Sequence, residues 1–221
     1  MNAEREQLVK ELDLDSRVQY EVLETLASLG PATFVISAIN AGLAFYILRE
    51  SAGSLLMLVW LLFMMAVIFS RLLAVLIFWR TRQEKLRLRG WFAVYLPLVY
   101  ITGIGWGLLP LTPAFDNDPL SWGFIIFMIS GMATGGLTTL YVKKSLVIPY
   151  LVLILMPLTF ALASGERPAD FAMCILSGLY LVTLVRSSYY LNNMANRTIR
   201  LDAENQHLFE FLLKAKRLKD D

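Results

Sequence analysis

Arg71 is the residue whose type and position best suit a chemical role, because it is a cation inside a long apolar stretch. A charged side chain within a membrane helix is costly and by default marks a functional site. Two interpretations remain open. Arg71 either faces other helices and binds an anionic group, a backbone carbonyl or the polar side of a ligand, or its long stem extends to the inner membrane interface. We expect no Asp or Glu inside the apolar stretches, so Arg71 has no predicted ion-pair partner there.

Uncharged polar side chains in the other apolar stretches could form a site together with this arginine. The candidate ligand-binding residues are Arg71, Trp106, Asn40, Tyr100 and Thr134. Further polar residues that could share such a site are Thr102, Ser130, Thr138, Ser177 and Tyr180. Hydrogen bonding between helices is the alternative interpretation for the uncharged members of this set. A site built from these residues lies within the bilayer, so the predicted signal is a small lipophilic molecule or a property of the membrane itself.

No catalytic or metal-binding motif is present. The sequence contains no P-loop, GxSxG, HExxH or CxxC pattern. Its one histidine, His207, lies in a charged segment without a phosphoacceptor motif, and we interpret it as a solvated helix position. We therefore predict no catalytic residue, no metal and no cofactor in this chain. The net charge of +2 does not indicate a nucleic-acid partner.

Six apolar runs must position these residues, and each is long enough to cross the ~30 Å hydrocarbon core of a bilayer as a helix. The mean hydropathy of +0.58 also indicates an integral membrane protein. The predicted fold is all-α, a polytopic bundle of six transmembrane helices, with Pro31 in the first turn of the first one. The predicted spans are residues 31–48, 55–79, 91–111, 120–141, 145–163 and 170–190.

The distribution of Lys and Arg predicts the orientation of the bundle. Sixteen of them lie in the two tails and in the loops after the second and fourth spans, whereas two lie in the opposite loops. By the positive-inside rule, both termini are cytoplasmic. The three outer loops are too short to form an extracellular ligand-binding domain.

Two pairs of glycines have the spacing that lets membrane helices approach closely. Gly103 and Gly107 belong to the third span, and Gly131 and Gly135 belong to the fourth. Because a short loop joins these two spans, we expect them to pack against each other. The sharper hypothesis is a deformable hairpin that rearranges on a stimulus.

The carboxyl-terminal tail combines good helix formers with a heptad repeat. Leu201 and Leu208 occupy one series of core positions, and Asn205 and Leu212 occupy the other. An asparagine at a core position can set the register of a dimer. We predict a cytoplasmic, coiled-coil-like signalling helix that forms a homodimer, with an ordinary surface helix as the alternative. The predicted domains are an amphipathic segment (1–30), the membrane sensor (31–190) and this helix (191–221).

The chain resembles the multi-span membrane input regions that precede bacterial histidine kinases, hybrid kinases and some cyclic-di-GMP enzymes. The features that carry this likeness are Arg71 after Trp60, Trp91, Gly103, Trp106-Gly107, Pro149, Pro157 and the segment 201–208. The resemblance implies a receptor in the bacterial inner membrane, surrounded by membrane lipid, which controls a kinase or cyclase domain in cis or a response partner.

The sequence departs from that family in one respect, because it contains no kinase phosphoacceptor, ATP-binding or GGDEF-like motif. We expect either the input module of a longer signal-transduction protein or a stand-alone membrane protein. The alternative functions are a small-molecule transporter or channel, and an enzyme acting on lipid. The sparse intramembrane charge argues against a proton-coupled transporter.

Overall fold

The computed structural model describes residues 14–80 and 88–220, and those residues form helices joined by short turns. The long helices are α2 (Leu14–Ala52), α3 (Ser54–Arg80), α4 (Leu88–Gly107), α6 (Pro119–Leu140), α7 (Lys144–Ala163) and α8 (Pro168–Asp220). Two short elements, η2 (Leu109–Leu111) and α5 (Ala114–Asn117), connect α4 to α6. Six helices are long and apolar enough to span a membrane, which confirms the predicted number of spans and the all-α class. The protein is a multi-pass membrane protein.

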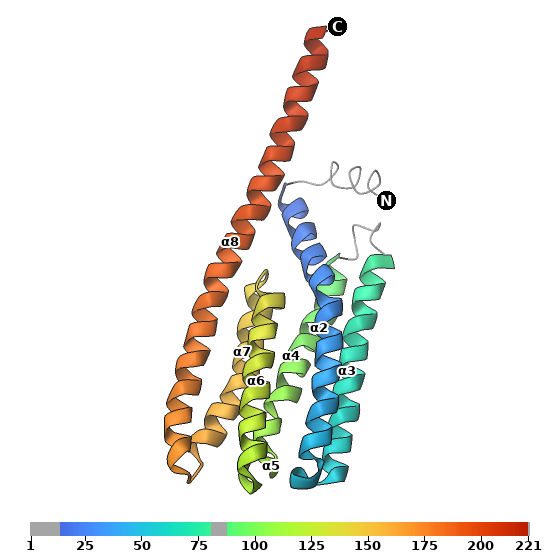
Figure 1. Cartoon of the computed structure of the whole chain (residues 1–221). Helices are drawn as coiled ribbons and strands as arrows, with labels where there is room; N and C mark the ends of the chain where they lie inside the picture. The colour runs from blue at the N-terminus through green and yellow to red at the C-terminus, as the bar shows by residue number, and fades with distance from the viewer. Residues whose placement is uncertain (1–13, 81–87, 221) are drawn as a thin grey trace.

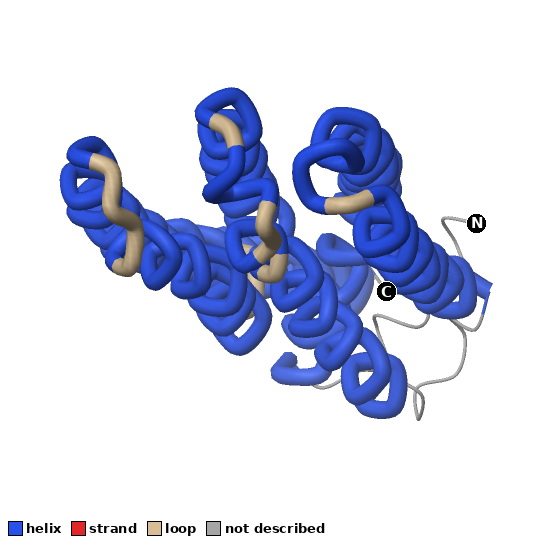
Figure 2. The backbone as a smooth tube through the Cα atoms, turned by 90° about the horizontal axis from the view of Figure 1, so that it is seen from below, coloured by secondary structure: helices blue, strands red, loops and turns tan. Residues whose placement is uncertain are grey.

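The six long helices form two layers of three. One layer contains α3, α4 and α7, and the other contains α2, α6 and α8. The closest pairs are the hairpins α2–α3 and α7–α8, while α4 packs between α3 and α7. Helix α6 packs on α7 and α2 but touches α8 over a short stretch only. Seen along the helices, the three connections at one end of the bundle lie side by side (Figure 2).

The two ends of the bundle differ. Helix α8 extends far beyond the other helices at one end, here named the tail side, where the beginning of α2 and the turn between α6 and α7 also lie (Figure 1). The opposite end, here named the loop side, holds the connections α2–α3, α4–α6 and α7–α8. Gly53 alone makes the first of these, with a φ of +94° that residues with a side chain rarely adopt.

Helix α2 does not begin at the predicted boundary. It is helical from Leu14 and continues through Pro31, so the placement of this proline in a first helical turn is wrong. A proline inside a helix costs about 3 kcal/mol because it removes one backbone hydrogen bond and crowds the preceding turn. Burial of Leu26 and Ala27 before the proline, and of Phe34 after it, offsets this cost by holding both halves of α2 against the bundle.

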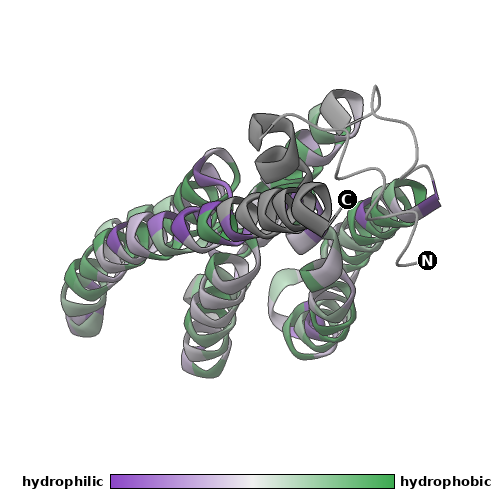
Figure 3. Ribbon diagram, turned by 90° about the horizontal axis from the view of Figure 1, so that it is seen from above, coloured by the Kyte–Doolittle hydropathy of each residue, from purple (hydrophilic) through white to green (hydrophobic). Residues whose placement is uncertain are grey.

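Apolar residues occur all along the helices of the bundle, as the hydropathy colouring of Figure 3 shows. Many of them are exposed on the outward surfaces of the helices. Phe127 on α6 is 79% exposed and Leu55 on α3 is 76% exposed, values typical of side chains that face lipid rather than water. The membrane part of α8 is the least buried of the six spans. Helix α8 therefore lies at the outside of the bundle, where it packs mainly on α7 and makes shorter contacts with α2 and α6.

Candidate functional site

Arg71 faces the interior of the bundle. The residue is 5% exposed, and its guanidinium reaches from α3 to α4. Its Nη1 donates to Thr102 Oγ1 at 3.3 Å, and its Nη2 donates to the Tyr95 hydroxyl at 3.1 Å. Of the two interpretations left open by the sequence, the geometry favours the one in which Arg71 faces other helices. The role of Arg71 in ligand binding remains a prediction.

Aromatic rings enclose the same guanidinium. Its central carbon lies 5.1 Å from the centre of the Phe34 ring on α2 and 5.4 Å from that of Tyr95. Trp91 stacks on Tyr95 with ring centres 4.6 Å apart, and its indole Nε1 donates to the Ala74 carbonyl at 2.6 Å. These contacts hold Tyr95 in place beside the cation. The sequence analysis missed Tyr95, although it lies one helical turn after Trp91, where the two rings were bound to meet.

Trp106 lies deeper than Arg71 toward the loop side and forms a separate cluster. It is fully buried, and its ring meets that of Trp60 edge-on at 5.5 Å. Trp60 Nε1 donates to the Gly105 carbonyl at 2.7 Å, which ties α3 to α4. The Trp106 Nε1 is buried and has no hydrogen-bond partner among the described residues.

The other candidate ligand residues lie at different helix contacts and do not form one site with Arg71. Asn40 donates to the thioether sulfur of Met132 at 3.3 Å, between α2 and α6. The Tyr100 hydroxyl donates to the Ser145 carbonyl at 2.6 Å, between α4 and α7. Thr134 lies between α6 and α8. These three positions therefore match the alternative interpretation, in which polar side chains form hydrogen bonds between helices.

The two glycine pairs differ in their surroundings. A side chain at Gly103 would approach Tyr150 and Leu153 of α7, and a Cβ at Gly107 would come within 2.3 Å of the Leu153 carbonyl oxygen. Gly131 and Gly135 have open space where a Cβ would be. The expected packing of the third span against the fourth is therefore wrong, because α4 places its glycines against α7. The connection through η2 and α5 is short, but it still allows α7 to pack between α4 and α6.

A buried ion pair attaches α8 to the loop side. Asp170 in its first turn is fully buried and lies 3.3 Å from Arg167 Nε, so our expectation of carboxylate-free spans is wrong at this helix end. Arg167 Nη2 also donates to the Phe115 carbonyl at 2.9 Å, and its guanidinium lies 5.3 Å from the Trp122 ring. These contacts connect the start of α8 to α5 and α6.

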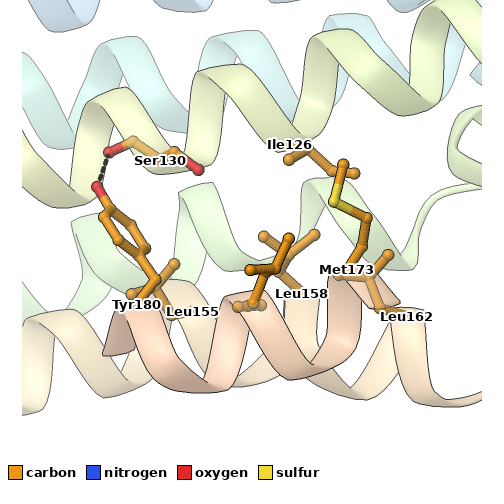
Figure 4. A pocket seen from close by; sticks show the side chains of 9 residues that line it. Ile126, Ser130, Leu155, Leu158, Leu162, Met173 and Tyr180 are labelled. Atoms are coloured by element: carbon orange, nitrogen blue, oxygen red, sulfur yellow. Dashed lines mark hydrogen bonds between the residues drawn. The ribbon is translucent and has the colours of Figure 1, made fainter. Parts of the chain in front are cut away.

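A tyrosine bridge attaches the middle of α8 to α6. The Tyr180 hydroxyl donates to the Ser130 carbonyl at 2.9 Å and shares a hydrogen bond with Thr134 Oγ1. On the loop side of this bridge the helices separate around a cavity of about 290 Å³ (Figure 4). The cavity is lined by Ile126, Ser130, Leu155, Leu158, Leu162, Met173, Leu176, Ser177 and Tyr180.

An asparagine attaches α8 to the turn between α6 and α7 on the tail side. Asn192 is 4% exposed, and its Nδ2 donates to the carbonyls of Tyr141 and Val142 at 2.9 and 2.6 Å. The neighbouring Asn193 accepts from Lys144 Nζ at 3.0 Å. The sequence analysis missed both asparagines. The one pattern in the sequence that could have identified them is a pair of adjacent asparagines after the sixth apolar run, where charged residues begin.

The predicted signalling positions lie beyond these attachments, on the exposed extension of α8. Leu201 is 48% exposed and Asn205 is also exposed. The side chains of Leu208 and Leu212 lie outside those that the structure describes. Helix α8 itself is continuous over all four positions.

No group of three or more His, Cys, Asp or Glu residues that could hold a metal ion occurs among the described residues. Comparisons of the chain with protein-family models, with curated proteins and with solved structures found no match.

Proposed function

We propose that this protein is the membrane-embedded sensory input module of a bacterial signal-transduction receptor. The bundle responds to a small lipophilic or membrane-borne signal, and α8 carries the response to a kinase or cyclase output domain in cis or to a response partner. The observation that carries this proposal is the continuity of α8, which runs unbroken from the loop side, through the membrane, to Asp220. A single helix that crosses the bilayer can transmit a tilt, a shift or a rotation.

A contiguous set of contacts connects the Arg71 region with α8. Arg71 is bonded to α4 through Tyr95 and Thr102. Helix α4 in turn meets the turn between α6 and α7, because Lys143 Nζ lies 4.8 Å from the Phe92 ring and Tyr100 donates to the Ser145 carbonyl. A displacement of α4 therefore acts directly on this turn.

The same turn is bound to α8 through Asn192 and Asn193. Lys144 adds a contact with the Tyr189 ring, at 4.9 Å from its centre. A packed chain of this kind is the physical route by which two sites can be coupled, although coupling itself must be measured. We therefore assign the turn between α6 and α7 the role of passing movement of the bundle to α8.

The exposed extension of α8 supports a dimeric transmitter. Its heptad positions Leu201 and Asn205 lie clear of the bundle, which leaves them accessible to a second copy of the chain. A parallel dimer joins Leu201, Asn205, Leu208 and Leu212 with their counterparts at a coiled-coil seam. By the positive-inside rule, the basic residues on the tail side support a cytoplasmic extension, and the proposed location of the bundle is the bacterial inner membrane.

Disulfide cross-linking in native membranes tests the dimeric transmitter. The only native cysteine, Cys174, is first replaced by alanine. Single cysteines are then introduced at Leu201, Leu208 and Leu212, with Ala203→Cys and Glu210→Cys as controls on the opposite helix face. We expect rapid dimer formation at the seam positions and slow formation at the controls. Equal rates on both faces would overturn the predicted seam.

Signalling is tested by an output enzyme that is active only as a dimer, fused in frame after Asp221. Leu201→Asn and Leu208→Asn should abolish its regulation without changing the amount of protein in the membrane. Asn192→Leu should have the same effect from within the bundle. Unaltered output in all three variants would refute the assignment of α8 as the transmitter.

A further inference from the structure

Two hydrogen-bond donors at Arg71, its own Nε–H and the hydroxyl of Tyr95, have no acceptor among the residues that the structure describes. The Nε–H is buried and has no partner among the described residues. The Tyr95 hydroxyl accepts from Arg71 Nη2, and within the same part of the chain no acceptor for its own proton is found. Nε and Nη2 are neighbours on a planar guanidinium, so the free Nε–H and the Tyr95 hydroxyl bonded to Nη2 belong to the same part of the site.

On the other side of the guanidinium, Nη1 has an acceptor. Nη1 donates to Thr102 Oγ1, which passes its own proton to the Leu98 carbonyl at 2.7 Å. Among the nitrogens of Arg71, Nε is the one that lacks any acceptor in the described residues. Tyr95 is 1% exposed, so its hydroxyl lies in the interior of the bundle.

The charge of Arg71 is also uncompensated in the described residues, since no carboxylate pairs with it there. Arginine keeps its positive charge in proteins, and burial without a counter-ion is costly in a low-dielectric interior. The group that best satisfies a guanidinium edge is an oxyanion, which accepts two parallel hydrogen bonds from the edge. A carboxylate or phosphate oxygen at this position would also accept the Tyr95 proton.

The depth of the site decides what carries the anion. Arg71 lies nine residues before Arg80, the last residue of α3, which corresponds to about 14 Å of helix. A free hydrated ion loses its water to reach that depth, whereas an anion attached to an apolar body partitions into the bilayer with it. The rings of Phe34 and Tyr95 provide an apolar surface on either side of the guanidinium.

We propose that the edge formed by Arg71 and Tyr95 binds the oxyanion head group of a membrane-partitioned amphiphile. This inference rests on the proposed sensory function, for which it supplies the chemical class of the signal. The head group is a carboxylate or a phosphate, and its source is either a free amphiphile or an anionic phospholipid. Binding displaces no ion pair and adds the acceptor that Nε and Tyr95 lack.

The test is a fluorescence titration of the full chain in nanodiscs of zwitterionic phosphatidylcholine. Trp91 is a suitable reporter because its ring stacks on Tyr95. The probes are decanoate, decyl phosphate and decanol, which share one apolar chain, together with inorganic phosphate alone. We expect a saturable change with the two anionic amphiphiles and none with decanol or inorganic phosphate.

Variants identify the binding groups. Arg71→Gln should weaken binding of the anionic probes about 100-fold or more, the order expected when one partner of a buried ion pair is lost. Tyr95→Phe, which keeps the cation and the ring, should weaken it about 5- to 10-fold through the loss of one hydrogen bond. Tyr190→Phe is the matched control, because Tyr190 is 66% exposed on α8. Circular dichroism of each variant verifies that it is folded.

Each outcome is decisive. Competition by added phosphatidylglycerol identifies a lipid head group as the source of the anion, and its absence identifies a free amphiphile. Equal responses to decanoate and decanol, saturable binding of inorganic phosphate, unchanged binding by Tyr95→Phe, or no response at all would overturn the inference. The cross-linking and fusion experiments do not depend on these probes, so a failed titration with regulated output would refute the ligand class alone.

Discussion

Asn192→Leu is the substitution that most directly tests how α8 is held by the bundle. Its amide donates to two carbonyls of the turn between α6 and α7, at 2.9 and 2.6 Å, and the residue is 4% exposed. Leucine has a similar volume but cannot donate. The loss of two hydrogen bonds, each with a net contribution of about 1 kcal/mol, lowers the free energy of local opening by about 2 kcal/mol.

Hydrogen–deuterium exchange of the chain in nanodiscs measures this change. An opening free energy lower by about 2 kcal/mol corresponds to about 30-fold faster exchange. The amides to follow are those bonded within the turn, such as Lys143 N to the Leu140 carbonyl and Leu146 N to the Lys143 carbonyl. Peptides from the loop side, around Asp118, should exchange as in the unmodified protein.

Asn193→Ala is the matched control. Asn193 is exposed and bonds to the exposed end of Lys144, so its loss should change the opening free energy by less than about 0.5 kcal/mol. Exchange in the turn should then rise by less than about 3-fold. Identical protection in Asn192→Leu and Asn193→Ala would show that the buried amide does not hold α8, and the proposed route would lose its buried contact between the turn and α8.

Three further predictions concern stability. Gly107→Ala should lower the thermal unfolding temperature in detergent because its Cβ would lie 2.3 Å from the Leu153 carbonyl oxygen, whereas Gly131→Ala, with open space there, should leave it unchanged. Trp60→Phe should reduce the free energy of unfolding in SDS titrations by about 1–3 kcal/mol, because the buried Gly105 carbonyl loses its donor. The pKa of Asp118, which caps α6, is held below its ordinary value of 3.8 chiefly by the Ser121 hydroxyl and by the Ser121 and Leu120 amides. The ionised form of Asp118 therefore stabilises the fold above pH 3.8, and this contribution is lost as the pH falls through the lower, folded-state pKa. Asp118→Asn should remove this part of the pH dependence, which acid-unfolding curves would measure.

The six spans were predictable because hydrophobic length alone identifies a membrane helix. Hydropathy does not report where a helix begins on the water side, so α2 was predicted to start at Pro31 although it is helical from Leu14. Proline suits a first turn, but tertiary packing of Leu26 and Phe34 outweighs that preference here. Local propensity was therefore a weaker guide than burial on both sides of the proline.

The contents of the candidate site were harder to predict because they depend on which helices are neighbours. Arg71 was identified from its charge and Thr102 was among the polar residues that could join it, but their pairing, and the part of Tyr95, required knowledge of the α3–α4 contact. The glycine pattern correctly marked a close approach at Gly107, yet the same pattern at Gly131 faces open space. The spacing of small residues shows that another helix can pack closely, but only the fold decides which face of the helix that neighbour contacts. Whether the candidate residues bind a ligand remains a prediction.

The unbroken course of α8 also limits how evolution can join this bundle to other domains. A helix turns by about 100° for each residue, so one inserted residue would rotate everything beyond the insertion by that angle relative to the membrane. Seven inserted residues restore the original facing to within about 20°. Under the proposed function, an output domain joined to this helix would therefore keep its facing only when the helix is lengthened or shortened by whole heptads.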